Sequence, residues 1–156
     1  VISTMGTLAS RASPDTFAAA PHIEVTSQPC PRFVEFVENG VPGGDELLAV
    51  AREYLAPLQE AEVDTLILGC THYPLLTGVI SYVMGDLVTL VSSAEETAKD
   101  VYRVLADGGA LRPDGLPAPR HECVTTGDPQ TFSRLARRFL GPEAAIESRR
   151  EAVAPG

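Results

Sequence analysis

Cys70 and His72 stand two positions apart in the segment Gly69-Cys70-Thr71-His72-Tyr73-Pro74. The segment follows an apolar run, Thr65 to Leu68, which has the length and composition of a short buried strand. An ordinary thiol is mostly protonated at neutral pH, so a cysteine that works as a base needs an imidazole or a helix amino end beside it. The spacing is therefore equally compatible with a thiol-based acid/base site and with a buried cysteine that packs as a small apolar residue.

The elements around this pair determine where the thiol would lie. Gly69 lets the backbone turn, and Pro74 suits the first position of a helix because a proline has no N–H to leave unpaired. We therefore expect an apolar helix from Leu75 to Met84, with Cys70 in a strand-to-helix turn. Such a turn lies at the carboxyl ends of the strands, which is where open α/β sheets bind ligands. A helix amino end there stabilises anions such as a thiolate or a carboxylate.

A second candidate site lies at the start of the chain. Val1 to Ser3 has the pattern of a strand end, and the small residues Thr4-Met5-Gly6-Thr7 follow it as a predicted turn. Backbone amides and two hydroxyls in such a turn can hold a small anion. Plain helix capping by threonine is the alternative interpretation.

The remaining pattern alternates strands with helices. It predicts strands at His22 to Thr26, Leu87 to Val91 and His121 to Thr126, and a loop at Gln28 to Pro31. It predicts helices at about 14–20, 33–39, 45–58, 93–106 and 129–139, the last three with Asp45, Ser93 and Asp128 as their N-caps. Pro57 is expected to bend or shorten the last turn of helix 45–58. In helix 129–139 we expect four buried side chains, those of Phe132, Leu135, Ala136 and Phe139. Such alternation indicates an α/β fold with a mostly parallel sheet and helices on both faces.

Composition excludes several classes of protein. The chain has 156 residues, 44% of them hydrophobic, and a formal net charge of −9, which argues against nucleic acid as a partner. The sequence shows no apolar run of membrane-spanning length and no basic-then-apolar leader pattern, so we expect no membrane partner and a cytoplasmic location. The first residue, Val1, already lies inside a predicted strand end, which suggests a truncated start.

We expect neither a cofactor nor a metal. Lys99 is the single lysine and lies inside a predicted helix, which disfavours pyridoxal phosphate, and no glycine-rich nucleotide motif occurs in a strand-turn-helix context. Cys70-x-His72 and His121-x-Cys123 lack the ligand spacing that is usual in zinc sites. Of the other two cysteines, Cys30 between two prolines is expected to be structural, and Cys123 to be a packing residue.

The run Leu68-Gly69-Cys70-Thr71-His72-Tyr73-Pro74-Leu75-Leu76 resembles the second catalytic motif of the glutamate racemases. Three further segments resemble that family in the same order: Cys30 to Val34, Val88 to Ala98, and Thr126 to Asp128 with Phe132. The resemblance implies an aspartate/glutamate racemase-like fold. Residues 1–91 would form most of the second α/β lobe and 92–141 a segment returning to the first lobe, with 142–156 a frayed tail.

The family interconverts L- and D-glutamate for bacterial cell-wall synthesis without a cofactor, by proton transfer between two cysteines. By resemblance, Cys70 matches the second cysteine, His72 the residue that assists it, and Thr71 a substrate-binding position. Glu38 matches an acidic residue near this cysteine, although spacing alone equally indicates a solvated carboxylate.

The resemblance assigns the substrate carboxylate to Thr4 and Thr7, and it implies a homodimer for a full-length enzyme. Two family features of the first half are absent here, an Asp-Ser pair and the Cys-Asn-Thr motif with the other cysteine. Cys30 does not replace that cysteine, because its Cys-Pro context matches a noncatalytic segment. We therefore expect this chain alone to be inactive. An aspartate or hydantoin racemase, and a noncatalytic binding module, are the alternatives.

Overall fold

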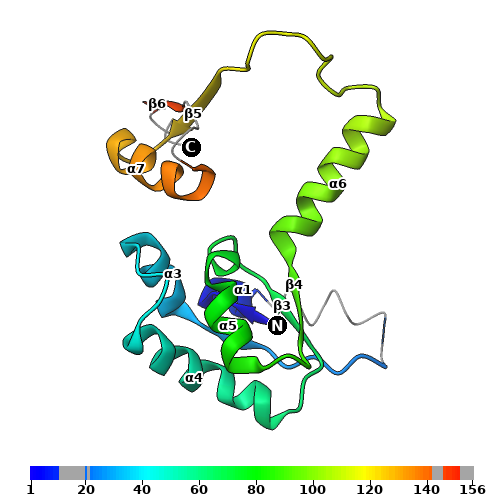
Figure 1. The fold of residues 1–156 in the computed structure, drawn as a ribbon, viewed down its shortest axis with the longest axis vertical. Helices are drawn as coiled ribbons and strands as arrows, with labels where there is room; N and C mark the ends of the chain where they lie inside the picture. Colours follow the sequence, from blue (N-terminus) through cyan, green and yellow to red (C-terminus); the bar gives the residue numbers. More distant parts are fainter. Residues whose placement is uncertain (11–19, 21, 142–145, 152–156) are drawn as a thin grey trace. The chain divides into compact units, whose positions relative to one another are not determined.

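A computed structural model of the chain describes residues 1–10, 20, 22–141 and 146–151. The chain divides into two compact units, Val1–Leu111 and Arg112–Gly156, whose elements are labelled in Figure 1. The helix expected at about 14–20 lies almost entirely outside the described residues.

The first unit contains a parallel sheet of four strands in the order β2-β1-β3-β4. Every described pairing in it is parallel, and β3 and β4 match residue for residue from Thr65↔Thr89 to Leu68↔Ser92. The strands are β1 (Ile2–Ser3), β2 (Gln28–Pro29), β3 (Thr65–Leu68) and β4 (Thr89–Ser92). This confirms the predicted α/β class with a mostly parallel sheet.

The position of β2 corrects two predictions. Residues 22–26 form no strand, whereas Gln28 and Pro29, predicted as loop, pair with Ile2 and Ser3. The N–H of Gln28 donates to the carbonyl of Val1, and the N–H of Cys30 donates to that of Ser3, each at 2.9 Å. Since these two residues supply the donors, the missing N–H of Pro29 does not interrupt the edge strand.

The helices of the first unit also differ in detail from the prediction. They are α1 (Met5–Ala9), α3 (Pro31–Asn39), α4 (Asp45–Glu60), the 3-10 helix η1 (Tyr73–Leu76), α5 (Thr77–Met84) and α6 (Ser93–Asp107). The expected turn at Thr4 to Thr7 is the N-cap and first turn of α1, which corresponds to the capping alternative. The single helix expected at Leu75 to Met84 is split between η1 and α5.

Three capping and helix-end predictions change by a residue or more. Gly44 at φ 109° is the N-cap of α4, and Asp45 is its first helical residue. Pro57 lies inside α4, which continues to Glu60. Ser92 rather than Ser93 caps α6, since its side chain accepts the N–H of Glu95 at 3.3 Å.

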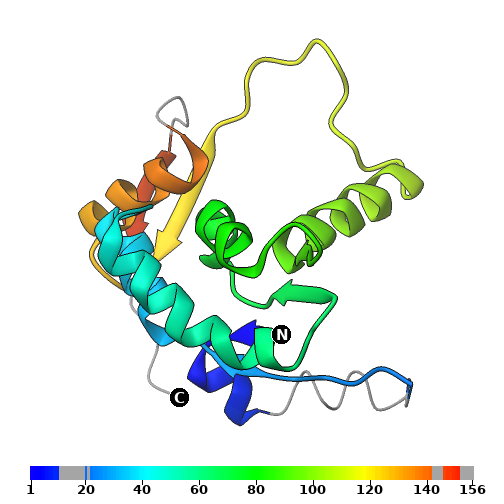
Figure 2. The ribbon, with the colours of Figure 1, turned by 60° about the horizontal axis from the view of Figure 1, so that its bottom comes forward.

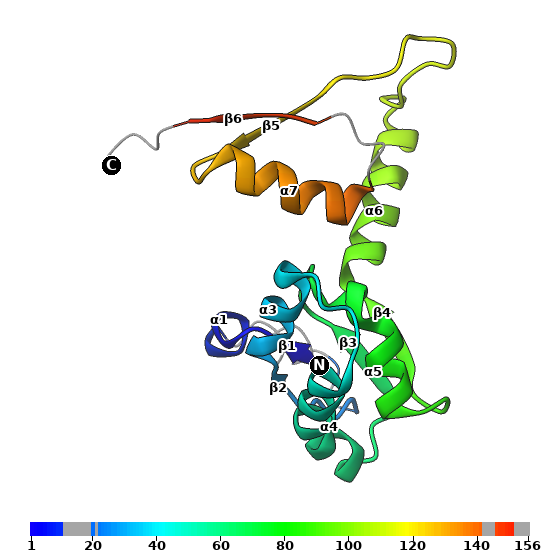
Figure 3. The ribbon, with the colours of Figure 1, turned by 60° about the vertical axis from the view of Figure 1, so that its left-hand side comes forward.

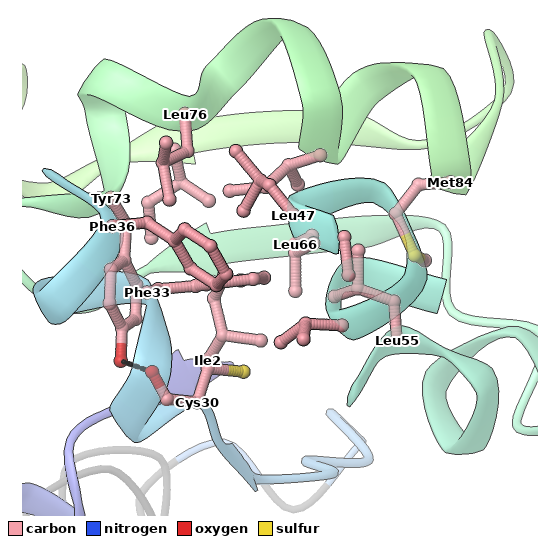
Figure 4. Packing of buried hydrophobic residues seen from close by; sticks show 14 of the residues in the cluster. Ile2, Cys30, Phe33, Phe36, Leu47, Leu55, Leu66, Tyr73, Leu76 and Met84 are labelled. Atoms are coloured by element: carbon pink, nitrogen blue, oxygen red, sulfur yellow. Dashed lines mark hydrogen bonds between the residues drawn. The ribbon is translucent and has the colours of Figure 1, made fainter. Parts of the chain in front are cut away.

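A hydrophobic cluster joins the central strands β1 and β3 to the helices α3, α4, η1 and α5 (Figure 4). Leu66 and Leu68 of β3 are buried against side chains from helices α3, α4 and α5 and from η1. Burial of such side chains is the main favourable term in folding, at about 1.5–3 kcal/mol each. The cluster consists of Ile2, Cys30, Phe33, Phe36, Val37, Leu47, Val50, Ala51, Leu55, Leu58, Leu66, Leu68, Tyr73, Leu76, Ile80 and Met84.

Helix α6 contrasts with this core. It follows β4 directly and extends away from the sheet in Figures 1 and 3, and none of its residues is buried. Val101, Tyr102 and Val104 are 54%, 64% and 67% exposed.

The second unit contains a parallel pair, β5 (His121–Thr125) and β6 (Ile146–Arg150), with α7 (Pro129–Leu140) along it (Figures 2 and 3). Asp128 caps α7 as predicted, since its carboxylate accepts the N–H of Thr131 at 2.8 Å. The four side chains predicted to be buried in α7 are at most half-buried, and Phe139 is 37% exposed. Strand β6 occupies part of the predicted frayed tail, because its backbone pairs with all five residues of β5.

Along the chain, the division between the two units falls between Leu111 and Arg112, whereas the sequence suggests a boundary after Val91, inside β4. That residues 92–141 return to another lobe stays a prediction. Among the helices that the structure describes, none is long and apolar enough to cross a membrane.

Candidate active site

The turn after β3 depends on Gly69. Its N–H donates to the carbonyl of Ile2 at 2.9 Å, and a Cβ at this position would lie only 2.9 Å from the same oxygen. Any side chain here would therefore push β1 and β3 apart. The N–H of Tyr73 donates to the carbonyl of Cys70 at 3.2 Å and closes the turn that holds the thiol.

His72 links the thiol to a carboxylate. Its Nδ1 lies 3.8 Å from Sγ of Cys70, and its Nε2 lies 3.3 Å from Oε1 of Glu38. The Cys70 side chain is half-buried, and the side chains of His72 and Glu38 are 23% and 47% exposed. An imidazole between a thiol and a carboxylate can take the thiol proton on one nitrogen while the carboxylate stabilises the resulting positive charge.

Glu38 reaches His72 from the last turn of α3. This helix begins at Pro31, one residue after β2, and ends at Asn39. Its C-cap is Gly40, whose φ of 75° is the left-handed conformation that favours glycine. Phe33 and Phe36 anchor α3 in the core. The sheet and the core thus place a carboxylate beside a histidine that is 34 residues away in sequence.

Thr4 and Thr7 form a second polar pair at the end of β1. Their hydroxyl oxygens lie 3.1 Å apart, and the N–H of Thr7 donates to Oγ1 of Thr4 at 3.3 Å. Ile2 is in register with Leu68, so Thr4 and Cys70 each follow that pair by two residues on neighbouring parallel strands. Both therefore leave the sheet at its carboxyl edge.

The structure brings Cys70, Thr71, His72 and Glu38 together, because Oγ1 of Thr71 also lies 3.5 Å from Nδ1 of His72. The predicted α-helix does not begin behind the thiol, since η1 intervenes and α5 begins only at Thr77. The imidazole of His72, rather than an α-helix amino end, is the group next to the sulfur, and the carboxylate of Glu38 contacts the other nitrogen of that imidazole.

Two supporting contacts had no signal in the sequence. The hydroxyl of the fully buried Tyr73 donates to the carbonyls of Ser3 and Cys30, at 2.8 and 3.0 Å. The hydroxyl of Ser93, at the start of α6, donates to the carbonyl of Leu68 at 2.8 Å. Both fix the strand ends that carry the site residues.

The other two cysteines lie outside the Cys70 turn. Cys30 is fully buried, and desolvation raises the pKa of its thiol to about 12, which agrees with the structural role expected for it. Cys123 is half-buried in β5 of the second unit. Within the described ranges, no three His, Cys, Asp or Glu side chains gather as a metal site would require.

Comparison with known proteins gives a consistent assignment. No family model matches the chain. A glutamate racemase of Parafrankia sp. is 61% identical over 99% of this chain and 56% of its own length. The crystal structure of a glutamate racemase from Bacillus anthracis matches with a TM-score of 0.82 at 36% identity, over 95% of this chain and 55% of that one.

A glutamate racemase from Francisella tularensis, solved in complex with D-glutamate, also matches with a TM-score of 0.82 at 30% identity. The match covers 98% of this chain and 56% of that one. The chain spans about half the length of the curated relatives that it matches. It is therefore a relative of the glutamate racemases in both sequence and fold, and it corresponds to about half of such a protein.

Proposed function

We propose that this chain supplies one of the two proton-transfer groups of a glutamate racemase, and that Cys70 is that group. The observation that carries the proposal is the half-buried thiol 3.8 Å from the His72 imidazole, at the carboxyl edge of a parallel sheet. The similarity to glutamate racemases along nearly the whole chain supports the choice of substrate.

Racemisation removes the proton on the α-carbon from one face and returns a proton to the opposite face. His72 first accepts the proton of Cys70, which leaves a thiolate beside the substrate. The thiolate then takes the α-proton, so that an S–H bond forms and the C–H electron pair stays on the α-carbon. A second thiol protonates that carbon from the other side, and the two thiols exchange roles for the opposite enantiomer.

The neighbouring groups have supporting roles in this proposal. The hydroxyls of Thr4 and Thr7 hold the substrate carboxylate, and that of Thr71 contacts the substrate near the thiol. Since the carbanion places a second negative charge next to the carboxylate, fixed hydroxyl donors lower its energy. Glu38 orients the imidazole of His72 and stabilises its protonated form.

The second thiol is not Cys30, because a fully buried thiol with a pKa of about 12 neither reaches a substrate nor ionises near neutral pH. In our proposal it comes from outside this sequence, which spans about half the length of its relatives. The 156-residue chain alone is accordingly inactive.

A chimera tests the proposal. The part of the Parafrankia racemase that this chain does not match is joined to this chain, and racemisation is followed by the optical activity of L-glutamate. We expect turnover by the chimera and none by the chain alone. Turnover by the chain alone, or a chimera that racemises L-aspartate but not L-glutamate, contradicts the proposal.

The wider role follows from the same proposal. The complete enzyme would act as a homodimer in the cytoplasm and provide D-glutamate for peptidoglycan, and it would need no cofactor. Sedimentation of the chimera tests the dimer, and restoration of growth to a bacterium that requires added D-glutamate tests the supply role.

A further inference from the structure

Tyr73 lies next to His72, yet the proton transfers described above do not use it. Its side chain is fully buried, and its hydroxyl points to the main chain of Cys30, as Figure 4 shows. The same hydroxyl donates to the carbonyl of Ser3. One phenol proton is thus shared between two carbonyls at 2.8 and 3.0 Å.

These contacts join the three segments that lead to the site. Ser3 ends β1 and immediately precedes Thr4, whereas Cys30 follows β2 and precedes α3, which carries Glu38. The N–H of Tyr73 itself donates to the carbonyl of Cys70. A single residue therefore touches the backbone beside the hydroxyl pair, the helix of the carboxylate and the turn of the thiol.

The aromatic ring of Tyr73 also has a packing partner on α3. The ring of Phe33 meets the ring of Tyr73 edge-on, with centroids 5.6 Å apart and planes at 89°. Phe33 in turn contacts Tyr54 of α4, with centroids 5.5 Å apart. Burial raises the pKa of Tyr73 well above its ordinary value of 10.0, so the phenol keeps its proton and remains a hydrogen-bond donor.

We propose that Tyr73 is a positioning residue, whose hydroxyl sets the placement of the Cys70 turn relative to Thr4 and to Glu38. The naming of these groups as a racemase site rests on the proposed function. The three-way contact itself does not depend on that function.

The backbone provides a way to separate positioning from folding. The carbonyl of Ser3 also accepts the N–H of Cys30 at 2.9 Å, and the carbonyl of Cys30 also accepts the N–H of Phe33 at 3.2 Å. Removal of the hydroxyl in Tyr73→Phe therefore leaves neither carbonyl without a donor, and the ring still fills its place. We expect this variant to fold and to lose only the two hydrogen bonds by which the hydroxyl ties the Cys70 turn to Ser3 and Cys30.

The test is alkylation of Cys70 by iodoacetamide in the 156-residue chain, followed by mass spectrometry of the peptide that contains this residue. Rates are measured over a pH series through neutrality for the unchanged chain, for Tyr73→Phe and for Tyr54→Phe, each with and without Glu38→Gln. Tyr54→Phe is the matched control, because it removes a hydroxyl from the same aromatic cluster. Protection of the buried Cys30 reports folding in every sample.

We expect Glu38→Gln to slow alkylation about threefold at neutral pH, the size of a partly exposed ion pair, in the unchanged chain and in Tyr54→Phe. In Tyr73→Phe the same substitution should have almost no effect, and the pH profile should shift while Cys30 stays protected. An equal effect of Glu38→Gln and an unshifted profile in Tyr73→Phe overturn the proposal. So does alkylation of Cys30 in Tyr73→Phe, since the hydroxyl would then stabilise the fold as a whole.

Failure of the role that the proposed function gives to Glu38 would produce a different result. If Glu38→Gln has no effect even in the unchanged chain, the supporting role of Glu38 is wrong. The role of Tyr73 is then decided by the pH profiles of Tyr73→Phe and Tyr54→Phe alone. A shift confined to Tyr73→Phe supports positioning, and matching profiles overturn it.

Discussion

Two regions of the chain differ in how they bury their apolar side chains. Between Ile2 and Met84, strands and helices share one hydrophobic cluster. In α6 and α7, by contrast, no described residue is buried, although both helices carry apolar residues at helical spacing. The residues of the candidate site, from Thr4 to His72, all belong to the region with a core. The chain thus builds the surroundings of one thiol from its own side chains.

The largest expected effect comes from a matched pair of leucines in these two regions. Leu55 in α4 is fully buried, whereas Leu105 in α6 is 39% exposed. Leu55→Ala should lower the free energy of unfolding by about 2–5 kcal/mol, because it leaves a cavity in a packed core. Leu105→Ala should cost under about 1 kcal/mol. Urea denaturation followed by circular dichroism measures both, and equal losses would mean that α6 is packed after all.

Gly69→Ala tests the close approach of β1 and β3. The added methyl would lie 2.9 Å from the carbonyl oxygen of Ile2, so the strands must separate. We expect a loss of about 1–3 kcal/mol, typical of overpacking. Gly78→Ala is the control, since a Cβ there meets nothing within 4 Å. If the two variants unfold at the same urea concentration, the approach of the strands is not tight.

Alkaline pH should destabilise the core through Cys30. Below its ordinary pKa of 9.0 the thiol is protonated in both states, so its contribution to stability is constant. Above that value the unfolded thiol ionises, whereas the folded one keeps its proton up to about pH 12. The free energy of unfolding should therefore fall by about 1.4 kcal/mol for each pH unit in this window.

Cys30→Ala should be less stable at neutral pH but should lose less stability as the pH rises. Denaturation curves at neutral pH and above pH 9.0 compare the two slopes. Tyr73, whose pKa is also raised by burial, keeps part of the slope in the variant. Identical slopes with and without the thiol would show that Cys30 ionises freely in the folded chain.

The smallest effect is expected on the exposed side of α6. Val104 is 67% exposed, and Val104→Thr should change the free energy of unfolding by no more than about 0.5 kcal/mol. Val50→Thr is the control in α4, where the side chain is only 5% exposed and a hydroxyl would be desolvated. A large loss in Val104→Thr would remove the contrast between the two regions.

The sequence predicts the elements that have strong local signals. The apolar run of β3 with its glycine, the cap at Asp128 and the long helix α4 follow from residue type and spacing alone. Strands β2 and β6 were missed because their residues, such as Gln28 and Glu147, are polar and become strands only by pairing with a distant segment.

The site shows the same division. Cys70 and His72 are neighbours in sequence, so their contact is predictable from spacing. The contact of His72 with Glu38 spans 34 residues, and only the resemblance to a family suggested it. The hydroxyl of Tyr73 reaches two carbonyls that the fold alone brings together, and no local pattern indicates such a contact.

The most direct test of the central claim is racemisation of L-glutamate by the chimera with single cysteine substitutions. We expect Cys70→Ala to lower the rate by about a thousandfold, because one face of the α-carbon then lacks its acid/base group. Cys123→Ala should leave the rate close to that of the unchanged chimera. Retention of activity in Cys70→Ala, or equal losses in the two variants, would contradict the assignment of Cys70 as a proton-transfer group.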